Sequence, residues 1–284
     1  MSKSRKSISP KRCIFCDFPK KMSSEHIWGR WLRDYVRADR KKHHIHLTRI
    51  PSPKLPSINE LRIRAGDPIQ ANVRVVCEEC NNTWLSQIQE QTKPVLIPLL
   101  QGKKTALAAS AQAQLAKWCT MATMTGEYID RDPLGQGVTL AERQFFWKQS
   151  AIPPNWRIWI ARYQRHKWKG EWIHLTLPIL DAENSAGLSP GDSATPNTQT
   201  TTFVIGELYV HVMSSTGHPD LAGKWAWPAF SRLSRLLIQV WPVKESFIAW
   251  PPESLTDRDA DTIPTLFSNV IDAASRSLLG RRLF

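Results

Sequence analysis

The chain has 284 residues, of which 42% are hydrophobic and 22% are charged, a composition typical of a globular protein and not of a disordered one. It carries 38 Lys and Arg against 25 Asp and Glu, which gives a net charge of +13. No apolar run approaches the roughly 18 residues of a membrane-spanning helix. No apolar segment follows the basic first residues either, so we expect a cytoplasmic protein without a secretory signal.

The positive charge is concentrated near the start of the chain. Residues 1–50 hold 14 Lys and Arg against 4 Asp and Glu, whereas residues 51–98 hold 5 of each. Basic surfaces bind polyanions because each phosphate contact releases counterions. We therefore expect this part to bind nucleic acid, with residues 1–12 as a basic tail. The alternative for the tail alone is a solvated segment that only aids solubility.

Four of the five cysteines form two Cys-x-x-Cys pairs, which are Cys13 with Cys16 and Cys77 with Cys80. Two such pairs complete the tetrahedral coordination of Zn²⁺, and cytosolic chains seldom keep disulfides. The spacing therefore predicts a structural zinc site. A redox dithiol is the alternative, although it needs only one pair. The fifth, Cys119, lies in an apolar run and is predicted to be a buried core thiol.

Polar residues stand beside both cysteine pairs. Glu25 and His26 follow the first pair after a short spacer, and Asn72 precedes a strand-like stretch that leads into the second pair. Asn81 and Asn82 come directly after the second pair and open a predicted helix that turns Trp84, Leu85 and Ile88 toward a core. The resulting order along the chain is Cys13, Cys16, Glu25, His26, Asn72, Cys77, Cys80 and Asn81.

This order resembles the four-cysteine HNH endonucleases, which are members of the ββα-metal (His-Me finger) nucleases, and the resemblance covers residues 13 to about 92. It implies that His26 is the general base and that Glu25 and Asn81 hold a catalytic divalent cation. It further implies that Asn72 holds the loop that orients His26 and that the zinc is purely structural. A neutral histidine can take a proton from water near pH 7. Oxygen ligands favour Mg²⁺ or Mn²⁺. Asn82 is the alternative ligand to Asn81.

The segment between the two pairs is longer than in minimal members of that family. We predict a helix from Arg30 to Lys41 and short strands near Ile45 to Ile50 and Leu61 to Ala65. Four arginines are candidate nucleic-acid contacts, with ordinary solvated surface as the alternative: Arg30, Arg33, Arg37 and Arg74. A histidine cluster (His43, His44 and His46) is interpreted as an exposed face that contacts phosphate or solvent, in preference to a metal site.

Residues 99–284 are predicted to form an α+β accessory domain in which helices flank a mainly antiparallel sheet. The predicted helices are Thr105 to Thr125, Thr139 to Gln149 and Ile263 to Leu279. The predicted strands are Arg157 to Tyr163, Glu171 to Leu177, Phe203 to Met213 and Leu236 to Trp241. A polar stretch at about 181–201 is predicted to be a mobile loop. This domain is a candidate for homodimer formation or for binding a partner protein.

Tryptophan is frequent, with 13 in the chain. Core packing is the favoured interpretation for six of them, and a stacking platform for bases is the alternative. These six are Trp156, Trp159, Trp172, Trp225, Trp227 and Trp241.

The predicted fold is therefore α+β, with a zinc-stapled HNH module at 13–98 followed by the accessory domain. The favoured function is a metal-dependent endonuclease that cuts DNA. One alternative is a zinc-stabilised DNA-binding protein without cleavage activity, but such a protein has no need of His26 together with its metal ligands. Another is a defence or mobile-element effector with the same chemistry, whose nuclease is released only when the accessory domain senses a trigger.

Overall fold

The computed structural model describes residues 12–36, 43–50, 58–65, 71–129, 135–164, 170–178, 195–217, 233 and 235–264. For residues 43–50, 58–65, 170 and 171 it describes the path of the backbone. The basic tail, Arg37, Trp225 and Trp227 lie outside these ranges, as do most of the predicted mobile loop and most of the predicted closing helix. Within the part of the chain that the structure describes, no helix combines the length and the apolar character needed to cross a membrane.

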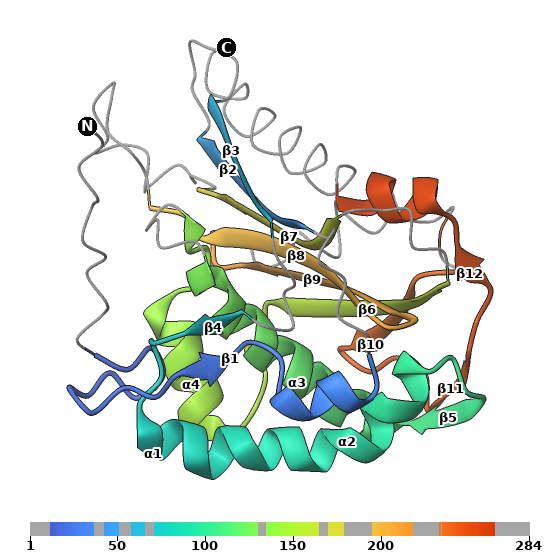
Figure 1. Cartoon of the computed structure of the whole chain (residues 1–284), viewed down its shortest axis with the longest axis horizontal. Coiled ribbons are helices and arrows are strands. Elements are labelled where there is room, and N and C mark those ends of the chain that lie inside the picture. The colour runs from blue at the N-terminus through green and yellow to red at the C-terminus, as the bar shows by residue number, and fades with distance from the viewer. Residues whose placement is uncertain are drawn as a thin grey trace.

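One curved sheet runs through the molecule, with strand order β10-β6-β9-β8-β7-β2-β3 and β12 paired to β6 (Figure 1). Its strands are β2 (His43–Ile50), β3 (Ile58–Ala65), β6 (Trp156–Tyr163), β7 (Gly170–Leu177), β8 (Thr198–Ile205), β9 (Leu208–Ser215), β10 (Ile238–Trp241) and β12 (Ser254–Leu255). Neighbouring strands are antiparallel except for β2 with β7 and β12 with β6. The predicted α+β class is confirmed.

Helices α2, α3 and α4 lie below the sheet in the view of Figure 1, and the helical residues 257–264 lie above it. The helices are α1 (Glu78–Cys80), α2 (Ser86–Leu100), α3 (Ala109–Gly126) and α4 (Leu140–Gln149). Short 3₁₀ helices are η1 (Arg30–Asp34) and η4 (Glu127–Ile129). Helix α4 begins as its sequence predicts, because Thr139 and Glu142 form a reciprocal capping box.

Two small sheets accompany the large one. Strands β1 (Glu25–His26) and β4 (Asn72–Val73) pair antiparallel, and so do β5 (Thr105–Ala108) and β11 (Phe247–Trp250). The predicted helix from Thr105 therefore starts four residues later than expected. Its first residues pair with β11, and this tertiary pairing overrides the helix propensity of alanine and leucine.

The segment inserted between the two cysteine pairs extends the large sheet. Strands β2 and β3 contain both of the stretches predicted to be strands there, and β2 pairs in parallel with β7. The predicted helix at Arg30 is shorter than expected. It is the five-residue 3₁₀ helix η1, which ends at Asp34, and the N–H of Tyr35 closes its last turn by donating to the carbonyl of Leu32. Residues 37–42 lie outside the described residues.

A hydrophobic core joins the cysteine-rich segment to the sheet. Trp28, two residues after His26, packs against Trp172 of β7 and Phe203 of β8, with ring centroids 6.1 and 5.9 Å away. Trp118 of α3 meets Phe203 from another side at 6.1 Å. Core packing is thus the role of the described tryptophans in the sheet: Trp156, Trp159 and Trp172 are buried, and Trp241 is partly buried.

The predicted strand from Phe203 to Met213 is wrong, because the chain forms a hairpin there. Strands β8 and β9 are joined by a two-residue turn, Gly206-Glu207. Gly206 has a φ of +57°, and a Cβ on it would lie 2.4 Å from the carbonyl oxygen of Leu100. Glycine is required at this position by both the backbone conformation and the close approach of α2.

Candidate active site and metal centre

The four paired cysteines gather at one point although about sixty residues separate the two pairs. Their sulfur atoms all lie within 4.8 Å of one another, and all four residues are buried. The first pair sits on a tight turn in which Asp17 adopts a φ of +56° and donates its N–H to the carbonyl of Cys13. The second pair opens α1, where the N–H of Cys80 donates to Sγ of Cys77 at 3.4 Å.

This cluster fits a tetrahedral metal ion. A Zn–S bond of about 2.3 Å places neighbouring sulfurs of a tetrahedron about 3.8 Å apart. Sγ of Cys16 and Sγ of Cys77 lie 3.8 Å apart. Four buried cysteines in this arrangement could hold a metal ion such as zinc, which agrees with the prediction from their spacing.

The ionisation of the thiols also favours a cation at this point. A hydrogen bond from Cys80 lowers the pKa of Cys13 to about 4, whereas burial raises the pKa of Cys16 to about 11. Four thiolates cannot share so small a buried volume without a compensating positive charge. A divalent ion supplies that charge and is the species that deprotonates its thiol ligands.

Beside the cluster, β1 and β4 form a short antiparallel pair that leads into the helix of the second cysteine pair. His26 lies opposite Asn72, and Glu25 lies opposite Val73. Ile14 and Ser23 donate their N–H groups to the carbonyls of Val75 and Val76 and so tie the first cysteine segment to the second. The two strands and the helix therefore stand in a fixed relation to the cysteine cluster.

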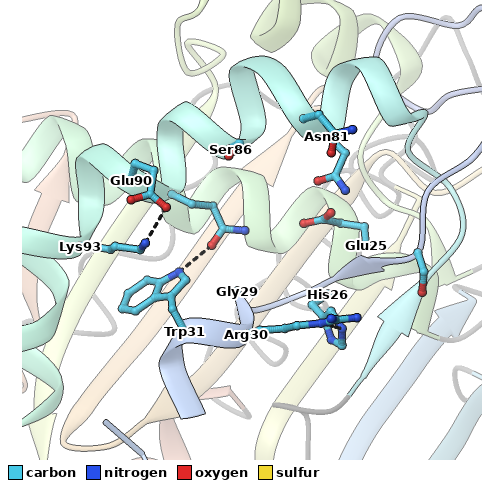
Figure 2. Close-up of a pocket in the computed structure, with 12 residues that line it drawn as sticks. Glu25, His26, Gly29, Arg30, Trp31, Asn81, Ser86, Glu90 and Lys93 are labelled. Atoms are coloured by element: carbon cyan, nitrogen blue, oxygen red, sulfur yellow. Dashed lines mark hydrogen bonds and ion pairs between the residues drawn. The ribbon is translucent and has the colours of Figure 1, made fainter. Parts of the chain in front are cut away.

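A single π-helical turn, η3 (Asn81–Leu85), lies between α1 and α2. Such turns are rare and are often found at functional sites, because they widen the helix and redirect its side chains. Here the turn begins at Asn81, whose side chain lies close enough to the carboxylate of Glu25 to oppose the rise of its pKa. Asn82 is exposed at the rim. Figure 2 shows the Glu25 carboxylate pointing across the gap toward Asn81.

These residues line one cavity of about 450 Å³ between β1, η1 and the η3–α2 helix (Figure 2). Three of the four predicted catalytic residues, Glu25, His26 and Asn81, share it. Asn72 is exposed opposite His26 and does not line it. The remaining lining residues are Ser24, Gly29, Arg30, Trp31, Asn82, Ser86, Gln89, Glu90 and Lys93.

Several of these lining residues were not predicted. Trp31 donates its indole N–H to Oε1 of Gln89 at 3.0 Å, and Lys93 pairs with Glu90 at 2.5 Å. A Cβ on Gly29 would lie 2.2 Å from Oε1 of Gln89 and 2.4 Å from Nε1 of Trp31, so a larger residue at this position would displace these two side chains and disturb their hydrogen bond. The spacing of Asn82, Ser86, Gln89 and Lys93 at three and four residues is a signal that sequence inspection could have used, because such residues share a helix face.

Glu25 is almost completely buried, with 6% of its surface exposed. Burial raises the pKa of Glu25 to about 7, and the side chain of Asn81 opposes that rise. Near neutral pH this carboxyl group is therefore divided between its protonated and ionised forms. A carboxylate with a raised pKa, facing a cavity, is a common property of functional sites.

His26 has a different environment from Glu25. Burial, and then the positive charges of Arg30 and Arg33, lower the pKa of His26. Its ring is consequently neutral at pH 7. Nε2 of His26 accepts a hydrogen bond from Nε of Arg30 at 2.8 Å. Its other nitrogen, Nδ1, is buried and has no hydrogen-bond partner among the described residues.

The predicted nucleic-acid contacts occupy different positions. Arg30 is exposed and lines the cavity, and Arg33 lies close enough for its charge to act on His26. Arg74 is exposed next to β4, outside the cavity. Arg37 lies outside the described residues. Arg30 and Arg33, which both belong to the short helix η1, thus lie near His26.

In comparisons with protein-family models, curated proteins and solved structures, nothing matches this chain significantly.

Proposed function

We propose that this protein is a metal-dependent endonuclease that hydrolyses phosphodiester bonds in DNA, with a structural zinc ion at the four cysteines. The observation that carries the proposal is the cavity shared by Glu25, Asn81 and His26. A buried carboxylate, an amide and a neutral imidazole are there placed beside a four-cysteine cluster. The order of elements (a strand pair followed by a helix) is also the one that the resemblance to HNH endonucleases implies.

The residues fit a catalytic divalent cation. Mg²⁺ and Mn²⁺ bind through one or two carboxylate or amide oxygens and keep several waters, so Glu25 and Asn81 are a sufficient protein contribution. Asn81 has to turn its amide so that oxygen, not nitrogen, faces the ion, which is a simple rotation of the side chain. When bound, such an ion stabilises negative charge on the phosphate and on the departing 3′ oxygen.

His26 supplies the base. Nε2 of a neutral imidazole accepts a proton from water, and the water oxygen forms a bond to phosphorus. The bond between phosphorus and the 3′ oxygen breaks, and the 3′ oxygen takes a proton from solvent. The products are a 5′-phosphate and a 3′-hydroxyl. Arg30 and Arg33, beside the base, are in position to contact the phosphates of the DNA strand.

The experiment is plasmid cleavage with Mg²⁺ or Mn²⁺ by the wild type and by His26→Ala, each first shown to hold one zinc per chain. We expect the wild type to cut, and we expect the variant to lose about 10²- to 10⁴-fold in rate, the usual contribution of a general base. If neither protein cuts and both bind DNA, the zinc-stabilised DNA-binding protein becomes the better description. Equal cutting by both would overturn the role of His26.

A further inference from the structure

The hydrogen bond between Arg30 and His26 occupies the atom that the proposed chemistry needs. Nε2 is the nitrogen of His26 that accepts from Arg30. The other nitrogen, Nδ1, is buried away from solvent and must carry the ring proton when Nε2 is an acceptor. As the site stands, no lone pair of His26 is free to take a proton from water.

We infer that Arg30 is a positioning residue that keeps His26 inactive until a DNA phosphate withdraws its guanidinium group. This inference rests on the proposed nuclease function and adds control by the substrate to it. Arg30 therefore distinguishes a polynucleotide, which carries phosphates on both sides of the scissile bond, from a small phosphodiester, which does not.

The position of Arg30 suits such a role. Arg30 is exposed on η1. Among the last residues of η1, Leu32 is buried and Arg33 and Asp34 are exposed, so the Arg30 side chain can move without disturbing the core. It donates to His26 through Nε alone, which leaves the donors of the two terminal nitrogens for a phosphate. Guanidinium groups bind phosphate in a bidentate manner, and charge-assisted bonds of this kind are stronger than a bond to a neutral imidazole.

The wall opposite Arg30 does not hold the guanidinium in place. The carboxylates that line the cavity are Glu25, which is buried and faces Asn81, and Glu90, which is paired with Lys93. Arg33 adds a second positive charge next to Arg30. A phosphate approaching this end of the cavity thus meets two cations, and moving Arg30 onto it releases Nε2.

The first test needs no catalysis. Diethyl pyrocarbonate acylates an accessible, unprotonated imidazole nitrogen, and the extent of modification at His26 is measured by peptide mass spectrometry. Arg30→Ala should be modified at His26 about tenfold faster than the wild type, because a hydrogen bond to a charged donor has been removed. Arg258→Ala, which removes an exposed arginine from the helical residues 257–264, is the charge-matched control. Equal rates for wild type and Arg30→Ala would contradict the inference.

The second test compares two substrates of the full-length protein with Mn²⁺: bis(4-nitrophenyl) phosphate and a linear DNA duplex. Arg30→Ala should raise kcat on the small diester several-fold, and it should raise KM on DNA, because a phosphate contact is lost. A lower kcat on both substrates would make Arg30 a catalytic residue and overturn the inference. An unchanged kcat on the diester would leave it a simple phosphate contact and also overturn it. If the wild type hydrolyses neither substrate, the nuclease proposal fails and the inference fails with it.

Discussion

Glu25 and His26 are adjacent in the chain, but the structure gives them opposite environments. Successive side chains of a strand point to opposite sides. Glu25 accordingly turns inward to Asn81, and His26 turns toward Arg30 of η1 (Figure 2). The burial of Glu25 raises its pKa to about 7, whereas the pKa of His26 is lowered. One residue is thus suited to bind a cation and the other to accept a proton.

The pKa of Glu25 predicts how metal binding depends on pH. In its folded state the carboxyl group holds a proton up to about pH 7, above its ordinary pKa of 4.5, so the contribution of Glu25 to folding stability falls as pH rises between these values. A cation competes with the same proton. We expect Mn²⁺ to raise the Tm more at pH 8 than at pH 6, where only about a tenth of the group is ionised.

Glu25→Gln should abolish this pH-dependent part of the Mn²⁺ effect, as measured by thermal unfolding. Glu90→Gln is the matched control, since Glu90 lines the same cavity but is exposed and paired with Lys93. An equal Tm shift at both pH values in the wild type would show that Glu25 does not hold the ion.

The two neighbouring asparagines can be separated by a similar comparison. Asn81 faces the carboxylate of Glu25 and opposes the rise of its pKa, whereas Asn82 is exposed at the rim of the cavity. Asn81→Ala is expected to weaken Mn²⁺ binding by at least about tenfold, which electron paramagnetic resonance of the free ion would measure. Asn82→Ala should have a smaller effect. The reverse order would assign the ligand role to Asn82.

At the scale of elements, the two cysteine pairs should hold the N-terminal segment in place. Each pair sits on its own turn. The two turns are tied together by backbone bonds such as Ile14 to Val75 and by two exposed ion pairs, Lys20 with Glu79 and Lys21 with Glu78. We expect Cys77→Ser to lose bound zinc and to lower the Tm markedly, because the binding energy of a structural zinc is folding energy. Zinc content and circular dichroism would measure this.

Cys119→Ala is the control for that variant. Cys119 is buried in α3, and burial raises its pKa, but it is not part of the four-cysteine cluster. This variant should keep one zinc per chain. If Cys77→Ser also kept it, the cluster would not be the metal site.

A second structural feature is the buried ion pair between η4 and α4. Glu127 accepts from Arg143 at 2.5 Å, and Glu127 also accepts the N–H groups of Gly137 and Val138 at 2.9 Å. Arg143→Met would leave a buried carboxylate without its cation. We expect a loss of about 3–5 kcal/mol in the free energy of unfolding, measured in urea.

The comparison for this pair is Arg162→Met. It breaks a pair with Glu207 that is about one quarter exposed, and it should cost about 1 kcal/mol or less. If Arg143→Met lowered the free energy of unfolding no more than Arg162→Met does, the buried carboxylate of Glu127 would not depend on Arg143 to balance its charge.

Some elements could be predicted from sequence and others could not, for physical reasons. The cysteine spacing predicts the four-cysteine cluster because each pair makes a local turn. The hairpin at Gly206 was missed because β8 and β9 are buried at every position, so neither alternation nor polarity marks them. Strand β8 is rich in threonine and looks like a loop, but cross-strand bonds satisfy its polar groups, as between Thr198 and Ser215 at 2.7 Å.

The candidate site, like the fold, could be predicted from the sequence only in part. Glu25, His26 and Asn81 were predicted from a motif, and they share one cavity. The opposite wall, with Trp31 and Gln89, was not predicted because its two sides come from segments about sixty residues apart. The hydrogen bond from Arg30 to His26 could not be predicted either, since it depends on the short turn that η1 makes after Gly29.

At the scale of the whole molecule, the described parts of the predicted nuclease module and accessory domain share one sheet and one core. Strand β2 pairs with β7, which follows it by more than a hundred residues, and Trp28 packs on Trp172. We therefore expect a single cooperative unfolding transition. Far-ultraviolet circular dichroism and tryptophan fluorescence should give the same midpoint, and two separate midpoints would show that the modules unfold independently.

The most direct test of the nuclease proposal is hydrolysis of a labelled DNA duplex in H₂¹⁸O with Mg²⁺, followed by mass spectrometry of the ends. The proposal predicts one ¹⁸O atom in each new 5′-phosphate, a 3′-hydroxyl without label, and no such product from zinc-loaded His26→Ala. Label in a 3′-phosphate, or the same labelled product from His26→Ala, would contradict the assignment of the attacking water and its base.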